Sequence, residues 1–173
     1  HVVQQTIDYV HKQEKKHHKK IKMSLTTNGM LLDKEKVKYL TDNHISLILS
    51  LDGRKEMHDR MRPDVNGEGT YDRIVKNLQY CVAHRNGEEY YVRGTFTRYN
   101  MDFTTDVEDM LDHGFPAVSM EPVVGEDTEA YSIKEEDLPR VKAEYDRLAK
   151  LFIQREEEGR PFFFFHFNMD LWK

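Results

Sequence analysis

One short stretch, residues 45–53, limits what this chain can fold into more than any other part of it. It reads Ile-Ser-Leu-Ile-Leu-Ser-Leu-Asp-Gly, an aliphatic run closed by a turn dipeptide, which is typical of a buried parallel strand. One parity of the run is entirely aliphatic, whereas the other becomes polar at Ser50 and Asp52. Ligands of α/β proteins lie at the carboxyl ends of parallel strands. Ser50, Asp52 and the charged loop after them are therefore the first candidates for a site.

Helical and strand patterns alternate along the whole chain. Helices are predicted over about 2–19, 33–43, 70–85, 102–113 and 134–158, with Asp33 and Thr70 placed as N-caps of the second and third. Strands are predicted over 21–27, 45–52, 90–98, 116–122 and 162–167. This alternation implies right-handed crossovers and a parallel sheet, either open or part of a barrel.

Four successive strands carry polar side chains on one parity. Barrel interiors are ordinarily filled by branched apolar side chains, so a polar lining predicts a cavity that holds a polar ligand. Alternatively, these groups bond one another or water inside a packed core. The residues concerned are Ser24, Thr26, Asn28, Ser46, Ser50, Asp52, Arg93, Thr95, Thr97, Ser119 and Glu121.

Composition narrows the class of protein. The 173 residues are enough for one domain with a sizeable core. The 26 basic and 31 acidic residues give a net charge of -5, which argues against a nucleic-acid or membrane partner; the basic run over 12–22 is expected to be a solvated helix face. Cys81 is the single cysteine, so neither a disulfide framework nor a cysteine metal site can form within this chain, and we expect it in the core.

The most specific pair of polar residues is Ser50 and Arg62. A serine hydroxyl can bond a ribose hydroxyl, and a guanidinium can hold a carboxylate through paired hydrogen bonds. Together they could bind a ligand with a sugar and an amino-acid carboxylate. The alternative is that Arg62 pairs with Asp59 or Asp64 on the surface.

Two other groups of residues have simpler interpretations. The histidines at 58, 113 and 166 lack metal-ligand spacing and are expected at helix ends or on the surface. The phenylalanines at 162–165 are expected in a strand that is covered on both sides.

Several motifs in order resemble one enzyme family. Residues 24–32, 49–53, His58-Asp59, Arg62 and 69–74 resemble the barrel of radical S-adenosylmethionine (SAM) enzymes, in the branch of the anaerobic sulfatase-maturating enzymes. Residues 93–100, 120–124, 131–139 and 164–171 resemble the maturases of six-cysteine (SCIFF) peptides. The resemblance implies a partial parallel (β/α) barrel that lacks the first strands. Residues 1–160 would form its middle and rear, and 161–173 would begin the connection to a C-terminal auxiliary-cluster (SPASM) domain.

The resemblance also implies roles for individual residues. Ser50 would bond the ribose of SAM, Arg62 would hold its carboxylate, and Val124 would meet the adenine through its backbone. Asn28 and Asp33 would lie near the cofactor or the peptide.

The implied reaction is reductive cleavage of SAM to a 5′-deoxyadenosyl radical, followed by hydrogen abstraction and thioether formation in a cysteine-rich precursor peptide. It would need a 4Fe-4S cluster and an electron donor such as a flavodoxin or ferredoxin, in the cytoplasm. The family's three-cysteine loop and Gly-Gly-Glu motif are absent and would lie before His1, and the auxiliary cysteines would lie beyond Lys173. We therefore expect this chain alone to hold no cluster and to be inactive.

Two alternatives come from other classes of protein. The chain could be a non-catalytic peptide-binding or scaffold module that keeps the barrel segment. It could also be a barrel enzyme that handles sugars or phosphates. Against the latter, the sequence has no glycine-rich phosphate loop and no acid/base pair beyond the lone Glu121.

Overall fold

The structure, a computed structural model, describes residues 2–87 and 89–169 and contains a five-stranded sheet. All four neighbouring pairs are parallel, and the spatial order of the strands is their order in the sequence. This is the arrangement of a partial (β/α) barrel, so the predicted fold class is confirmed. The strands are β1 Ser24–Thr27, β2 Ser46–Ser50, β3 Tyr90–Phe96, β4 Ala117–Pro122 and β5 Phe163–Phe164.

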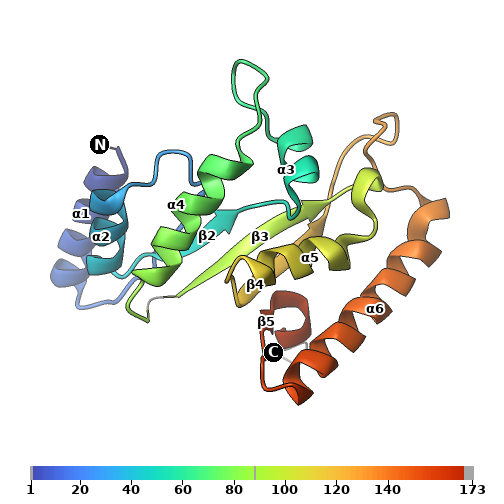
Figure 1. Ribbon diagram of the computed structural model, residues 1–173. Helices are drawn as coiled ribbons and strands as arrows, with labels where there is room; N and C mark the ends of the chain where they lie inside the picture. Colours follow the sequence, from blue (N-terminus) through green and yellow to red (C-terminus); the bar gives the residue numbers. More distant parts are fainter. Residues whose placement is uncertain (1, 88, 170–173) are drawn as a thin grey trace.

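Helices connect the strands and follow the predicted alternation, with one addition. Figure 1 shows α1, α2 and α4 beside the first strands, and α5 and α6 beside the last ones. The charged loop after β2, for which no helix was predicted, contains the short helix α3. The helices are α1 Val2–His17, α2 Lys34–Asp42, α3 Lys55–Met61, α4 Tyr71–Ala83, α5 Phe103–Asp112 and α6 Leu138–Glu157, with single 3-10 turns η1 Arg98–Asn100, η2 Glu135–Asp137 and η3 Phe165–Asn168.

One face of the sheet, which we call the covered face, packs against the helices. Its aliphatic and aromatic side chains are buried with those of α2, α4 and α5 in a single core. Gly94 permits close packing within this core, because a Cβ there would lie 2.7 Å from Met120 Sδ and 2.8 Å from both Leu51 O and Met110 Cε. The sheet residues of this core are Leu47, Leu49, Leu51, Val92, Phe96, Val118, Met120 and Phe164.

The opposite face, which we call the open face, carries the predicted polar parity. In the sheet register Ser50 lies beside Arg93, and Arg93 lies beside Ser119. One row nearer the amino ends, Ile48 lies beside Tyr91. Ser50 is partly exposed and Arg93 is exposed, whereas Ser119 is fully buried, so the open face stays accessible around Ser50 and Arg93.

The C-terminal segment covers one part of the open face. Phe165 in η3 stacks on Tyr91, with ring centroids 5.6 Å apart. The predicted strand over 162–167 is therefore too long, because it ends at Phe164 and turns. Coverage on both sides is also wrong: Phe164 is buried, but Phe163 is 42% exposed. The division at residue 160 stays a prediction, and residues 170–173 of the predicted connection lie outside the described residues.

Candidate functional site

The loop after β2 is organised by Asp52, which is only 3% exposed. Arg62 donates from Nε to Asp52 Oδ2 at 2.5 Å and from Nη2 to Oδ1 at 3.0 Å. The backbone N–H of Thr95 also donates to Oδ1, at 3.0 Å. Asp52 thus ties the Arg62 guanidinium to the carboxyl ends of β2 and β3. The expected surface pairing of Arg62 with Asp59 or Asp64 is wrong, because the chain folds back over Asp52.

His58 stabilises the same loop from inside. The backbone N–H of Asp52 donates to His58 Nδ1 at 3.3 Å, so Nε2 carries the ring proton and donates to Thr70 Oγ1 at 3.1 Å. The Thr70 hydroxyl in turn donates to the Arg62 carbonyl at 2.7 Å. Burial lowers the pKa of His58. His58 lies in the last turn of α3, as a helix-end position predicts, but the expected surface position is wrong, because α3 turns its ring into the core.

Of the two predicted N-caps, Asp33 is confirmed and Thr70 is wrong. Asp33 caps α2 as predicted, since its Oδ1 accepts the Lys36 N–H at 2.8 Å. Thr70 precedes α4, but its hydroxyl makes no capping hydrogen bond. Asp59 takes that function by accepting the Tyr71 N–H at 2.8 Å. The cap of α4 is therefore supplied from α3, which ties the two helices together.

A second ion network, which the sequence analysis did not identify, ties this loop to α5. Arg54 Nε donates to the fully buried Asp106 at 2.7 Å, and Arg54 Nη2 donates to Asp102 at 3.0 Å. The hydrogen bond to Asp106, with support from Asp102, raises the pKa of Arg54. Gly53 passes so close that a Cβ would lie 2.2 Å from the Asp106 Cβ. These contacts fix the loop that follows Ser50.

All five predicted site residues lie at the carboxyl end of the sheet. Ser50 ends β2, and its hydroxyl has no hydrogen-bond partner among the described residues. Val124 lies two residues beyond β4 and is 95% exposed. Asn28 follows β1 and accepts the Met30 N–H at 3.2 Å, while Asp33 also pairs with Lys36. The structure brings these residues to one end of the sheet, and their roles stay predictions.

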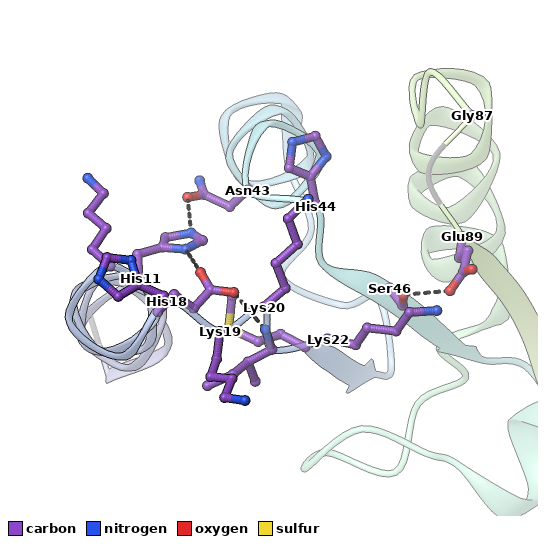
Figure 2. Close-up of a pocket in the computed structure, with 14 residues that line it drawn as sticks. His11, His18, Lys19, Lys20, Lys22, Asn43, His44, Ser46, Gly87 and Glu89 are labelled. Carbon is purple, nitrogen blue, oxygen red and sulfur yellow. Dashed lines mark hydrogen bonds and ion pairs between the residues drawn. The ribbon is translucent and has the colours of Figure 1, made fainter.

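A cavity of about 880 Å³ lies at the other end of the sheet. Figure 2 shows it between the end of α1 and the amino ends of the first strands, lined by lysines, histidines and two glutamates. His11 bonds Glu14 at 2.8 Å and Asn43 at 3.2 Å, and Ser46 donates to Glu89 at 3.1 Å. None of the five predicted site residues lines this cavity.

A further polar cluster lies in the C-terminal half of β4, beyond the two residues that pair with β5. Ser119 donates to Glu121 Oε1 at 2.7 Å, and His166 Nε2 lies 3.0 Å from Glu121 Oε2. The Tyr145 hydroxyl lies 3.2 Å from His166 Nδ1. Burial acts to raise the pKa of Glu121, but the Ser119 hydrogen bond and His166 outweigh it, so this pKa is lowered. Burial raises the pKa of Tyr145 to about 12. His166 was expected at a helix end or on the surface; it lies in the 3-10 turn η3 and pairs with Glu121.

Comparisons with known proteins agree with this geometry. No family model matches the chain. A cysteine-type anaerobic sulfatase-maturating enzyme of Clostridium novyi is 32% identical over 62 residues, which are 36% of this chain and 17% of that enzyme. The Clostridium perfringens (strain 13) enzyme is 39% identical over 75 residues, or 42% of this chain and 20% of that enzyme. The chain thus spans less than a quarter of the length of these relatives.

These two relatives are anaerobic sulfatase-maturating enzymes, the branch of the radical SAM enzymes that the motifs of this sequence resemble. Solved structures show the same fold. That of anSMEcpe with bound AdoMet and a peptide superposes with a TM-score of 0.80 at 20% identity, covering 95% of this chain and 46% of that one. Streptococcus suis SuiB bound to S-adenosylmethionine has a TM-score of 0.56 at 19% identity, covering 79% and 31%. The resemblance to the sulfatase-maturating branch is confirmed.

The described residues fit a radical SAM enzyme in one respect and not in another. The free Ser50 hydroxyl and the exposed position of Val124 are suited to contact with a nucleoside. An iron–sulfur cluster needs several thiolates, whereas Cys81 is buried in the core as predicted and burial raises its pKa. No group of three or more metal-ligating side chains occurs within 2–87 and 89–169. Within those ranges, no helix is long and apolar enough to span a membrane.

Proposed function

We propose that the protein to which this chain belongs is a radical SAM maturase that modifies a peptide. The observation that carries the proposal is the set of polar strand ends around the free Ser50 hydroxyl, on a fold shared with a structure that holds AdoMet and a peptide. The homologous sulfatase-maturating enzymes support the same class of reaction. When bound, SAM would supply a hydrogen-abstracting group, and the cluster would be held by cysteines outside this chain.

Residues of this chain would bind and orient SAM. Ser50 would bond the ribose hydroxyls, because its own hydroxyl has no partner among the described residues. Arg62 would hold the carboxylate: Asp52 accepts from its Nε and Nη2, and Nη1 has no partner among the described residues. Val124 would meet the adenine through its backbone. Asn28 and Asp33 would lie near the cofactor or the peptide.

The finer part of the proposal concerns the substrate. The motifs at 93–100, 120–124 and 164–171 resemble SCIFF maturases, so we propose thioether formation in a cysteine-rich precursor peptide. A SPASM-type domain with auxiliary clusters would follow the barrel. The reaction would take its electron from a flavodoxin or ferredoxin in the cytoplasm.

The proposal is tested with the product of the complete reading frame, reconstituted anaerobically with iron and sulfide. We expect release of 5′-deoxyadenosine from SAM and the loss of two hydrogens from the peptide, read by mass spectrometry. Ser50→Ala should raise the Kd for SAM about fivefold, because a hydrogen bond in a binding site contributes about 1 kcal/mol.

Ser24→Ala is the matched control, since Ser24 lies on the same parity at the amino end of the exposed strand β1. It should leave the Kd unchanged. A reading frame without a three-cysteine loop would contradict the enzyme and support the non-catalytic peptide-binding module. Equal effects of the two substitutions would contradict the placement of SAM at Ser50.

A further inference from the structure

Arg93 lies at the centre of the open face. It is the fourth residue of the seven-residue strand β3, and in the sheet register Ser50 and Ser119 are its two neighbours. Neighbouring strands are roughly 5 Å apart, so a ligand that contacts Ser50 is within reach of the Arg93 side chain. The residue is exposed although it sits in the middle of a sheet.

The Arg93 guanidinium has no hydrogen bond or ion pair with any described residue. Other arginines at this end of the sheet are already paired: Arg54 with Asp102 and Asp106, Arg62 with Asp52, and Arg98 with Asp137 at 3.2 Å. Arg93 therefore differs from the arginines that hold the loops together, and nothing in the described part explains its charge as structural.

The neighbouring carboxylate does not satisfy Arg93. Glu121 lies one row farther along β4 than Ser119, and its two oxygens are engaged by Ser119 and His166. Arg93 acts on Glu121 only through the electrostatic field, which helps to lower the pKa of that carboxyl. The planar guanidinium keeps its paired donors for another acceptor.

We propose that Arg93 binds a carboxylate of a ligand that lies over the open face. The inference rests on the proposed function, because both ligands of such an enzyme can bring a carboxylate there: SAM through the amino-acid carboxylate that Arg62 would also contact, and the peptide through an acidic residue. A guanidinium holds a carboxylate through two parallel hydrogen bonds. In the same row Ser50 is partly exposed, and Ser119 is buried and bonded to Glu121, so Arg93 is the single charged group of that row.

The test measures equilibrium binding by the cluster-loaded product of the complete reading frame. The variants are Arg93→Gln, which removes the charge, and Arg93→Lys, which keeps the charge but loses the paired geometry. Arg73→Gln is the control, since Arg73 is exposed on the outer helix α4. The probes are SAM, decarboxylated SAM, a precursor peptide with an acidic residue near its target cysteine, and the same peptide with the amide in place of the acid.

Arg93→Gln should weaken binding of one carboxylate-bearing probe about 10- to 100-fold, the range for a charged hydrogen-bonded pair. It should leave the matched probe without the carboxylate unaffected. Arg93→Lys should give an intermediate loss, and Arg73→Gln none. A loss confined to SAM assigns the carboxylate to the cofactor, and a loss confined to the acidic peptide assigns it to the substrate.

Two results overturn the inference, and they are distinguishable. If Ser50→Ala weakens SAM binding but Arg93→Gln changes no probe, the proposed function stands and the role of Arg93 is wrong. If the wild-type protein binds neither SAM nor peptide, both proposals fall. A loss of equal size for the probes with and without a carboxylate also contradicts the role. Circular dichroism of each variant checks that the fold is kept.

Discussion

The two faces of the sheet are built from the same strands but in different ways. On the covered face, Leu47, Leu49, Val92 and Phe96 of β2 and β3 are buried in one core with side chains of α2, α4 and α5. On the open face, the intervening residues are hydroxyls, an arginine and a carboxylate, and most of them keep contact with solvent. A one-residue step along a strand thus separates the core of the protein from its candidate site.

This difference shows how stability and function are divided. The covered face supplies the free energy of folding, because burying apolar area contributes about 25 cal/mol per Å². The open face contributes little of that energy, so its side chains are available for a ligand. The comparison predicts that neighbouring substitutions on one strand have very different costs.

The largest difference is expected between Leu49 and Ile48, which are adjacent in β2. Leu49 is fully buried on the covered face, so Leu49→Ala should lower the free energy of unfolding by about 3 kcal/mol, through lost burial and a cavity. Ile48 is partly exposed on the open face, so Ile48→Ala should cost about 1 kcal/mol or less. Urea unfolding of both variants gives the measurement. Equal losses would mean that the open face is packed by a segment beyond the described residues.

The elements that sequence analysis predicted are those specified by short-range pattern. Alternation identified four strands, an aromatic run identified the fifth with too great a length, and the polar parity identified the face on which Ser50 and Arg93 lie. Asp33 was correctly predicted as a cap because an aspartate three residues before an N–H can bond it without help from the rest of the chain. These features depend on neighbours within a few residues.

The elements that were missed depend on contacts between distant segments. Helix α3 is seven residues long and mostly charged. Its Asp59 accepts the Tyr71 N–H at the start of α4, and this contact holds α3 in place. Arg62 could pair with three aspartates by sequence distance alone, and only the fold selects Asp52. The burial of His58 follows from the same selection. The charged loop after β2 is therefore packed against the rest of the chain, although its composition predicts a surface loop.

A pH-dependent change in the free energy of unfolding, of intermediate size, is expected at His58 in α3. Burial lowers the pKa of His58 below its ordinary value of roughly 6.5. A group with a lowered pKa stabilises the fold above the unfolded value, and that contribution is lost as pH falls through the folded pKa. The loss is at most about 1.4 kcal/mol for each pH unit between the two values. Urea unfolding at pH 7.5 and 5.5 measures it.

His58→Gln should remove this part of the pH dependence, whatever it does to stability at pH 7.5. His17→Gln is the control, because His17 is exposed at the end of α1. His11 acts in the opposite direction in the same pH range, since its hydrogen bond to Glu14 raises its pKa. His11 is present in each variant and in the wild type, so its contribution to the pH dependence cancels when they are compared. An unchanged slope in His58→Gln would show that His58 can take up a proton in the folded chain.

The smallest effect is expected on the open face itself, at Glu121. Glu121→Gln keeps the size of the side chain but removes the charge that faces His166, and about three quarters of each side chain is screened from solvent. The free energy of unfolding should fall by about 1 kcal/mol or less. Amide hydrogen exchange in η3 should become faster, because His166 loses its charged partner on β4.

Glu157→Gln, on the exposed end of α6, should change neither quantity. The lowered pKa of Glu121 predicts how the effect depends on pH. Its contribution to the free energy of unfolding is present above the ordinary glutamate pKa and is lost as pH falls through the lowered value. The difference between Glu121→Gln and wild type should therefore shrink in acid. If Glu121→Gln instead costs as much as Leu49→Ala, the open face stabilises the fold as strongly as the covered one. The division between a stabilising face and a ligand-binding face would then be wrong at β4.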